Sequence, residues 1–276
     1  MVLRDGLEAS DFRSPEPNGH MPRAVLRFYA ELNDFLAPAE RQQVIVRSCA
    51  PRTSIKDLIE GIGVPHTEID LLLVNGAPVD FDYRVQDDDR ISVYPVFESL
   101  DIGNVTRVRP VPLRTLRFAV DQHLGRLAAY LRLAGFDAWH RNDADDDTLA
   151  TLEAGGRVLL TRDQGLLKRR SVTRGYWVRS TAPKAQLVEV LRRFDLAGSV
   201  QPFRRCLRCN ILLEPAQKSE VAPALPPRVR DANDEFMRCP ECARLYWRGT
   251  HFDALRNVLE SALSEVEKLK SGTVEK

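Results

Sequence analysis

Two short segments decide the fold of the central part of the chain: residues 116–121 (LRFAVD) and residues 157–163 (RVLLTRD). Each is a mainly apolar run that ends on an aspartate, Asp121 in the first and Asp163 in the second, before a predicted helix. Buried parallel strands have this composition, and in open α/β sheets the carboxyl ends of the strands line the ligand crevice. The two segments therefore predict two strands of a parallel sheet with both carboxylates on one edge.

A third group of acids, Asp145-Asp146-Asp147, lies between these strands at the start of another predicted helix. We select Asp146 as facing the same edge, because it precedes the core-facing Leu149 by three residues. Carboxylates on one edge repel each other unless a hard cation joins them, and Mg²⁺ or Mn²⁺ prefers oxygen ligands. Such ions activate water and neutralise charge on a phosphate, so the pattern predicts a metal-dependent nuclease. The alternative is that each aspartate only caps its helix. The predicted catalytic metal ligands are Asp121, Asp146 and Asp163.

Strands and helices are expected to alternate over residues 113–200, which is typical of a parallel sheet with right-handed crossovers. The expected strands are 116–120, 138–140, 157–161 and 176–179. The expected helices are 123–134, one opened by the acidic group, 164–170 and 184–194.

Charge is distributed unevenly along the 276 residues, although the net charge is only +1. Residues 22–98 carry 13 acidic and 8 basic residues, whereas residues 107–212 carry 20 basic and 10 acidic residues. This asymmetry indicates that the middle of the chain faces a polyanion, the alternative being a solvated Arg-rich surface. Contacts to phosphates would position an RNA backbone without reading its sequence. The predicted RNA-binding residues are Arg126, Arg162, Lys168, Arg169 and Arg170.

The pattern of residues 22–98 predicts a small separate domain. Residues 23–30 and 43–48 alternate like half-buried antiparallel strands, and Thr53 or Ser54 then caps a helix. Asn75-Gly76 is a hairpin-turn signal, and a last strand is expected at 89–96. The order ββαββ resembles the β-grasp, ubiquitin-like fold, which includes small sulfur carriers.

Sulfur-carrier chemistry needs a free C-terminal Gly-Gly, which this domain lacks. Its end reads VFES at residues 96–99, and the chain continues. We therefore expect an interaction or substrate-guiding module that can bind a protein partner. Residues 99–112 are interpreted as a linker, and residues 1–21 as a disordered leader.

Four of the five cysteines form two C-x-x-C pairs, Cys206 with Cys209 and Cys239 with Cys242, separated by 29 residues. Two such pairs close a tetrahedral zinc site, and four thiolates leave no open position, so the Zn²⁺ is expected to be structural. This predicts a zinc ribbon over 201–252, followed by a C-terminal helix and tail over 253–276. Unpaired thiols and a metal site suit a reducing compartment, so we expect a cytoplasmic protein. No apolar run approaches the ~20 residues of a membrane span.

Three longer stretches carry a resemblance to a known family: AVDQHLGRLAAYLRLAGFDA with DDDTLATLEAGGRVLLTRDQGLLKRR, then RCLRCNILLEP, then MRCPECARLYWRGTHFDAL. They resemble the RNase domain at the C-terminus of the Mut-seven exonucleases, a PIN-like nuclease fold fused to a zinc ribbon. A related bacterial arrangement places a ubiquitin-like domain before it. The resemblance thus implies a multi-domain protein of mixed α+β and α/β class: a β-grasp domain, a PIN-like α/β domain and a zinc ribbon.

The resemblance also implies a chemistry: divalent metals on acidic residues, water as the nucleophile and single-stranded RNA as the substrate. By motif position it assigns Asp121 and Asp163, while the triple aspartate blurs the position of Asp146. Many PIN domains carry a further acid after a later strand, where this chain has Val-Arg-Ser-Thr at 178–181. Two functions remain open: a metal-dependent ribonuclease, or a catalytically weak RNA-binding scaffold.

Overall fold

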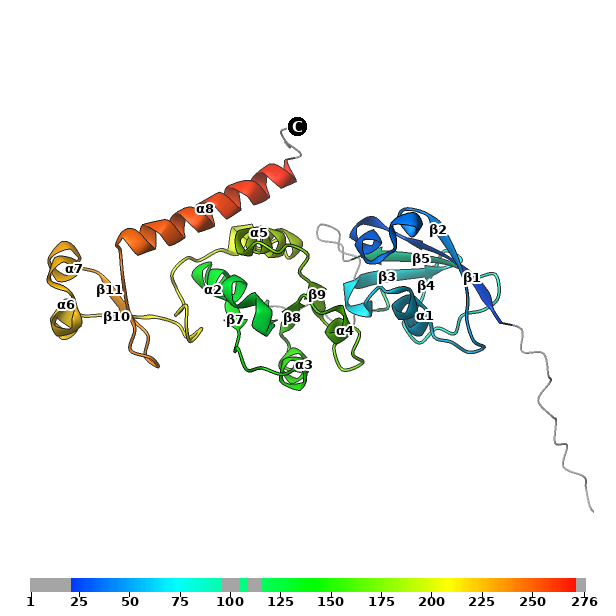
Figure 1. Ribbon diagram of the computed structural model, residues 1–276, viewed down its shortest axis with the longest axis horizontal. Coiled ribbons are helices and arrows are strands. Elements are labelled where there is room, and N and C mark those ends of the chain that lie inside the picture. The colour runs from blue at the N-terminus through cyan, green and yellow to red at the C-terminus, as the bar shows by residue number, and fades with distance from the viewer. Residues whose placement is uncertain (1–20, 96–104, 109–115, 272–276) are drawn as a thin grey trace, which may run out of the picture.

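The computed structural model describes residues 21–95, 105–108 and 116–271 (Figure 1). Three parts follow one another along its length: the N-terminal domain at one end, a central domain, and a cysteine-containing domain at the other end. Of the expected leader (1–21) only Met21 is among the described residues, and of the expected linker (99–112) only residues 105–108 are. Within the described ranges, no helix is both long and apolar enough to cross a membrane.

The N-terminal domain is a five-stranded mixed sheet of order β2-β1-β5-β3-β4, with the eight-residue helix α1 packed against it. Strand β1 pairs in parallel with β5, and the other neighbours are antiparallel. This confirms the predicted β-grasp arrangement. Its elements are β1 (Arg23–Phe28), η1 (Ala30–Phe35), η2 (Pro38–Glu40), β2 (Val44–Ser48), α1 (Ile55–Ile62), η3 (His66–Glu68), β3 (Ile69–Val74), β4 (Ala77–Pro78) and β5 (Arg90–Pro95).

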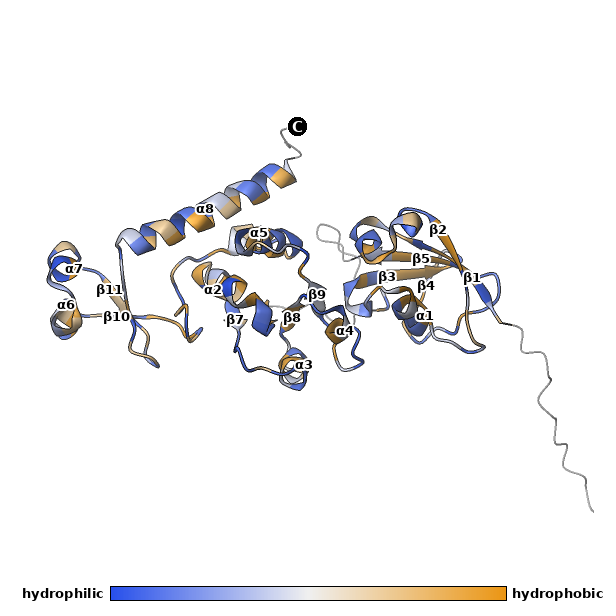
Figure 2. Cartoon of the chain, viewed as in Figure 1, coloured by the Kyte–Doolittle hydropathy of each residue, from blue (hydrophilic) through white to orange (hydrophobic). Residues whose placement is uncertain are grey.

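Local sequence signals explain two features of this domain. The side chain of Ser54 caps α1 by accepting a hydrogen bond from the backbone N–H of Asp57 (3.1 Å), which resolves the choice between Thr53 and Ser54. Asn75 and Gly76 both have positive φ angles, 51° and 85°, as a two-residue type I′ hairpin turn requires. Strands β1 and β3 are mainly apolar, in keeping with the domain core they form (Figure 2).

The central domain is a four-stranded sheet of order β7-β6-β8-β9 in which all pairs are parallel, as predicted. The expected helix 123–134 divides into a 3₁₀ turn and an α-helix, and the other limits shift by a few residues. Its elements are β6 (Arg117–Val120), η4 (Gln122–Leu124), α2 (Gly125–Leu133), β7 (Asp137–Trp139), α3 (Asp146–Ala154), β8 (Val158–Thr161), α4 (Gln164–Leu167), β9 (Gly175–Trp177), α5 (Pro183–Arg193) and η5 (Ala197–Ser199).

Helices cover both faces of this sheet. Residues of α2 and α5 form the larger core with one face, and residues of α3 and α4 form a smaller core with the other. Gly135 ends α2 with a φ of +97°, and a Cβ atom there would lie 2.3 Å from the carbonyl oxygen of Gln201. Only glycine fits this position, because it lets the chain leading to the cysteines pass directly over the end of α2.

The C-terminal part holds a small antiparallel sheet and a long helix that returns to the central domain (Figure 1). Leu259, Ala262 and Val266 of this helix are at most 2% exposed and belong to the larger central core. The predicted terminal helix is thus part of the central domain's packing. The elements are β10 (Glu214–Ala216), α6 (Lys218–Val221), η6 (Ala222–Ala224), α7 (Pro227–Ala232), β11 (Phe236–Arg238), β12 (Leu245–Trp247) and α8 (Thr250–Lys270).

Candidate functional site

Asp121 and Asp163 follow neighbouring strands, β6 and β8, and one hydroxyl connects them. Thr161 donates its Oγ1 hydrogen to Oδ2 of Asp121 (2.6 Å) and accepts a hydrogen bond from the backbone N–H of Asp163 (2.9 Å). Thr161 is fully buried and Asp121 is 6% exposed, whereas Asp163 is exposed. The carboxyl ends of the two strands therefore place both predicted ligands on one edge of the sheet, as the sequence indicates.

The two aspartates differ in their local role. Asp163 is the N-cap of α4, and its Oδ1 accepts hydrogen bonds from the N–H groups of Gly165 (2.7 Å) and Leu166 (3.4 Å). Asp121 makes no capping hydrogen bond to η4. Capping therefore accounts for Asp163 in part but does not account for the buried carboxylate of Asp121.

The acidic group lies at the start of α3, with Asp145 before the first turn and Asp146 and Asp147 in it. Asp145, not Asp146, is the N-cap, and its Oδ1 accepts from the N–H of Thr148 (2.8 Å). Asp147 pairs with Arg169 at 2.9 Å, and all three aspartates are exposed. Among the described residues, the structure does not bring the carboxylate of Asp146 within ligand distance of both other acids, since only a cysteine group satisfies that criterion.

Glu189 of α5 lies against the end of β9, where residues 178–181 (VRST) carry no acid of their own. Its Oε1 accepts from the hydroxyl of Tyr176 (3.0 Å) and the N–H of Arg179 (2.7 Å), and its Oε2 accepts from the N–H of Ser180 (2.8 Å). This carboxylate is engaged in holding the end of β9.

Of the predicted RNA-binding residues, two are engaged within the protein. Nη1 of Arg162 donates to the carbonyl oxygens of residues 178, 179 and 180, which fixes the chain after β9. Arg169 pairs with Asp147. Arg126 and Arg170 are exposed, and Lys168 is half-buried at the end of α4.

His140 lies on the same edge of the sheet, directly after β7. One ring nitrogen is 3.3 Å from the carbonyl oxygen of Gln122, and a Cβ atom on Gly125 would meet the ring at 3.0 Å. Burial lowers the pKa of His140, an effect that Asp121 partly opposes. Gly125 of the D-x-H-L-G-R-L stretch thus makes room for an imidazole beside the first turn after Asp121.

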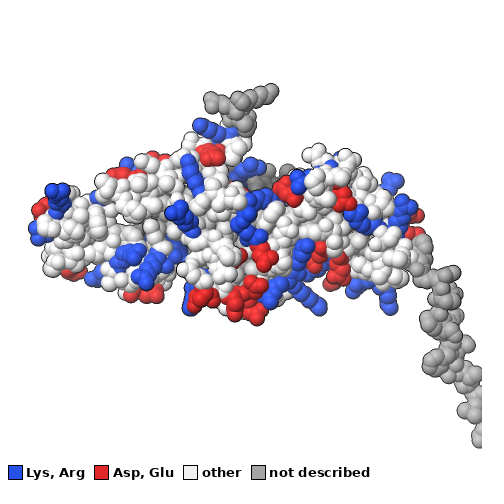
Figure 3. All heavy atoms as spheres, in the orientation of Figure 1, with Lys and Arg blue, Asp and Glu red and all other residues white. Residues whose placement is uncertain are grey.

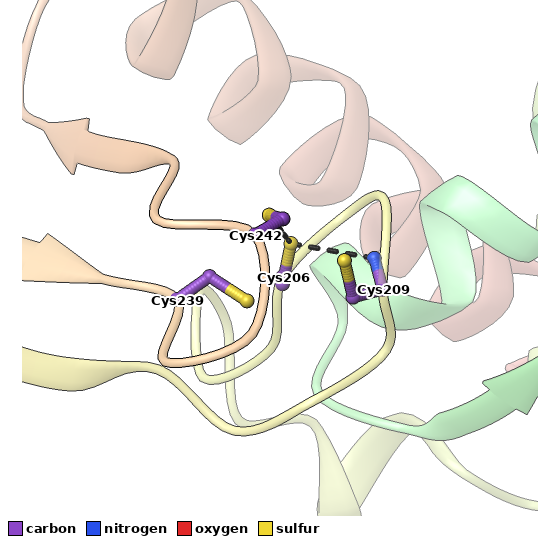
Figure 4. A group of neighbouring side chains, drawn as sticks. All are labelled: Cys206, Cys209, Cys239 and Cys242. Carbon is purple, nitrogen blue, oxygen red and sulfur yellow. Dashed lines mark hydrogen bonds between the residues drawn. The ribbon is translucent and has the colours of Figure 1, made fainter.

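The four predicted zinc ligands come together at one point (Figure 4). The sulfur atoms of Cys206, Cys209, Cys239 and Cys242 all lie within 4.8 Å of one another. The separation between Sγ of Cys206 and Sγ of Cys242 is 3.7 Å. Tetrahedral zinc with Zn–S bonds of 2.3 Å requires about 3.8 Å between sulfurs, so the group has the composition and spacing of a structural zinc site.

The thiols of this group perturb one another. Burial alone would raise the pKa of Cys206, but hydrogen bonds from the hydroxyl of Tyr246 and from backbone N–H groups lower it to about 7. Burial and the neighbouring Cys242 raise the pKa of Cys209 to about 12. Four thiolates cannot coexist here unless a cation neutralises them, which agrees with a metal site.

A polar network attaches the first cysteine loop to the edge strand β7. The side chain of Asn210 donates to Oδ1 of Asp137 (2.7 Å) and accepts from the N–H of Ala138 (3.0 Å). Arg132, which is 5% exposed, donates through Nη1 to the carbonyl oxygens of Leu207 and Arg208. Hydrogen bonds from Arg157 and Asn210 outweigh the effect of burial and lower the pKa of Asp137.

Comparison with protein families found two matches: the Mut7-C RNAse domain over residues 116–259 and the Mut7-C ubiquitin domain over residues 21–101. The chain belongs to the Mut7-C RNase family. The first match spans the parallel sheet, all four cysteines and half of α8, and points to a nuclease. Comparison with curated proteins gave no match, and neither did comparison with solved structures.

The sequence patterns interpreted above do not single out three residues that contribute to the two sites of this Mut7-C family member. Thr161 lies in the L-L-T-R-D stretch, and Asn210 directly follows the second cysteine. The hydroxyl of Tyr246 donates to Sγ of Cys206 (3.1 Å). Two local signals could identify the first two: a threonine at the end of the strand before Asp163, and an asparagine directly after the first C-x-x-C pair.

Proposed function

We propose that this Mut7-C protein is a metal-dependent ribonuclease that hydrolyses phosphodiester bonds of single-stranded RNA. The observation that carries the proposal is the pair of aspartates, Asp121 and Asp163, on adjoining strand ends, where the hydroxyl of Thr161 bonds the carboxylate of the first and the backbone N–H of the second. The family match supports a nuclease, and the basic composition of the central region supports a polyanionic substrate.

The residues of this edge fit Mg²⁺ or Mn²⁺ by the chemistry of their donors. Both offer hard carboxylate oxygens, and Oδ1 of Asp121 accepts no hydrogen bond from the described part of the chain. Mg²⁺ commonly binds through one or two carboxylates, water and substrate phosphate, so two acids suffice for one ion. When bound, the ion would activate water and neutralise charge on the phosphate. Asp146 is proposed as a third ligand from the start of α3.

The chain itself would orient these groups. Thr161 fixes Oδ2 of the buried Asp121, so that Oδ1 is the oxygen left for a ligand. The exposed Asp163 stands at the N-terminus of α4, close to the basic residues 168–170 that we propose to hold the RNA backbone with Arg126 and Arg162. We also propose a cytoplasmic protein with structural Zn²⁺ on its four cysteines.

The second candidate is an RNA-binding scaffold with little or no catalysis. It is favoured by the exposed Asp146, which is not gathered with the other two acids among the described residues, and by the engagement of Glu189 with backbone N–H groups. One experiment separates the two functions.

The test uses Asp→Asn substitutions, which keep side-chain size and remove one negative charge. Wild-type protein should cleave unstructured RNA with Mg²⁺ or Mn²⁺ and stop in EDTA, and added Mg²⁺ should restore cleavage. Asp121→Asn and Asp163→Asn should each lower the rate by about 10²–10³-fold while the protein remains folded.

Asp143→Asn is the matched control. Asp143 is exposed, pairs with Arg141 before α3 and is outside the proposed ligands, so its variant should cleave like wild type. A contaminating nuclease would be insensitive to all three substitutions. Equal cleavage by all proteins, or no cleavage with either metal, would reject the ribonuclease in favour of the scaffold.

A further inference from the structure

A groove of about 650 Å³ lies at the junction of the ubiquitin-like and nuclease domains. Both domains contribute to its walls, and their basic side chains face the same space. The ubiquitin-like domain supplies Lys56, Phe81 and Arg84, and the nuclease domain supplies Lys168, Arg170 and Arg174.

The balance of charge in this groove favours an anionic ligand. Its lining holds five Lys and Arg residues against three acids. Two of these acids are engaged: Asp57 accepts from the hydroxyl of Ser54 (2.6 Å), and Glu60 pairs with His66 (2.6 Å). On the basic side, the side chains of Lys56, Lys168 and Arg170 make no hydrogen bond or ion pair with any described residue. Figure 3 shows both basic and acidic side chains on the face of the molecule where the two domains meet.

The two walls of the groove are held at a fixed separation by buried hydrogen bonds. His66 Nε2 lies 2.7 Å from the carbonyl oxygen of Val172, and the N–H of Trp177 donates to Oε1 of Glu68 (2.6 Å). Both His66 and Glu68 belong to η3 of the ubiquitin-like domain and are at most 6% exposed. The groove is therefore a preformed feature and needs no domain movement to assemble.

The groove also begins close to the acidic edge. Asp163 caps the first turn of α4, and Lys168 is the residue at its other end. At about 1.5 Å per residue along a helix, the five residue steps from Asp163 to Lys168 span about 8 Å. A strand bound at Lys168 would thus lie one short helix away from Asp163.

We propose that this groove binds the phosphate backbone of single-stranded RNA, so that the ubiquitin-like domain forms half of the substrate site. The inference rests on the proposed ribonuclease function and extends it to a domain that the sequence predicts to be an interaction or substrate-guiding module. RNA is favoured over an acidic peptide because the lining combines cations with the partly exposed ring of Phe81, as single-strand binders do. The groove also lies close to Asp163, a proposed metal ligand of the ribonuclease site, which favours RNA as its ligand.

The experiment measures binding of a labelled oligouridine of about 16 nucleotides to the full chain carrying Asp163→Asn, in EDTA. Adding Lys56→Glu with Arg84→Glu should weaken binding about tenfold at low salt and flatten the log–log salt slope by about 1.4, the value for two lost phosphate contacts. Arg23→Glu with Arg90→Glu is the matched control. It changes the charge of the same domain equally, at exposed strand positions outside the groove, and should leave the affinity near that of the parent.

Three results of these binding measurements would overturn the inference. Equal weakening by both pairs, or no weakening by the groove pair in a folded protein, overturns the inference. So does a polyglutamate peptide that binds the groove as tightly as the RNA and displaces it. Because the binding experiment does not involve hydrolysis, the two proposals can fail separately. RNA binding in the groove without any cleavage by the wild-type protein would reject only the ribonuclease function. Cleavage by the wild-type protein, with no loss of RNA binding in Lys56→Glu with Arg84→Glu, would reject only the groove as an RNA site.

Discussion

The hydroxyl of Thr161 is the smallest unit on which the proposed metal site depends. It is fully buried between Asp121 and Asp163, donates to the first and accepts from the backbone of the second. A residue of this kind does not touch the substrate but sets the orientation of a ligand, and loss of such partners commonly costs 10–100-fold in metal affinity or activity. Thr161 is therefore a positioning residue.

Thr161→Val should separate positioning from folding. The substitution keeps the shape of the side chain and leaves Asp121 and the N–H of Asp163 without their partner, at a cost of about 1–3 kcal/mol in unfolding free energy. We expect cleavage to need about 10–100-fold more Mg²⁺ for half-maximal rate. Thr161→Ser retains the hydroxyl and should restore the Mg²⁺ dependence. If Val and Ser variants respond alike to Mg²⁺, the hydroxyl has no role in holding the metal.

The sequence predicts the positions of Asp121 and Asp163 well, because an aspartate at the end of an apolar strand has few places to lie. It predicts Asp146 less well, since three consecutive aspartates at a helix start offer three equivalent registers, and Asp145 takes the cap. Arg162 shows a second limit of sequence-based prediction. Its place in a basic segment indicates a phosphate contact, but the sequence does not reveal that its Nη1 also donates to three carbonyl oxygens that only the folded chain brings together.

At the scale of elements, the spacing of apolar residues is sufficient to predict the strands and helices of the two larger domains. The strands and helices of both domains lie within a few residues of their predicted limits, because apolar spacing and caps such as Ser54 are local signals. The docking of α8 was not predicted. Its apolar face was evident, but a helix pattern does not say which neighbour it covers, and here it is the nuclease core.

The zinc ribbon leads to a prediction at this scale. Purified protein should contain about one zinc per chain, and Cys206→Ser should lose the zinc and lower the stability of the C-terminal part, because structural zinc binding is itself folding free energy. Elemental analysis and thermal unfolding measure the two effects. Cys49→Ser is the control, since Cys49 is buried in the ubiquitin-like domain and should retain full zinc. Absence of zinc, with all four thiols freely titratable in the native protein, would refute the site.

Over the whole molecule, the ubiquitin-like domain covers β9, the edge strand of the nuclease sheet. Arg179 lies at the centre of this contact: its guanidinium approaches the rings of Phe35, Tyr176 and Trp177 at 5.2–5.4 Å. It also pairs with Asp34 at 2.8 Å and lies 3.7 Å from Glu68. Burial would lower the pKa of Arg179, but Tyr176, Glu68 and Asp34 raise it. No local pattern could reveal this contact, because its partners are more than 100 residues apart.

The two acids beside Arg179 provide a matched test of how the domains are held together. Glu68 is fully buried and also accepts from the N–H of Trp177, whereas the side chain of Asp34 is 48% exposed. Glu68→Ala removes one partner of a buried charge pair, which costs about 3–5 kcal/mol, whereas an exposed pair such as that of Asp34 contributes at most about 1 kcal/mol. Hydrogen exchange at the amide of Trp177 should therefore accelerate strongly in Glu68→Ala and little in Asp34→Ala, and small-angle scattering should detect a longer particle only in the first. Similar exchange rates in the two variants would mean that the packed rings, and not the buried carboxylate, hold the ubiquitin-like domain against β9.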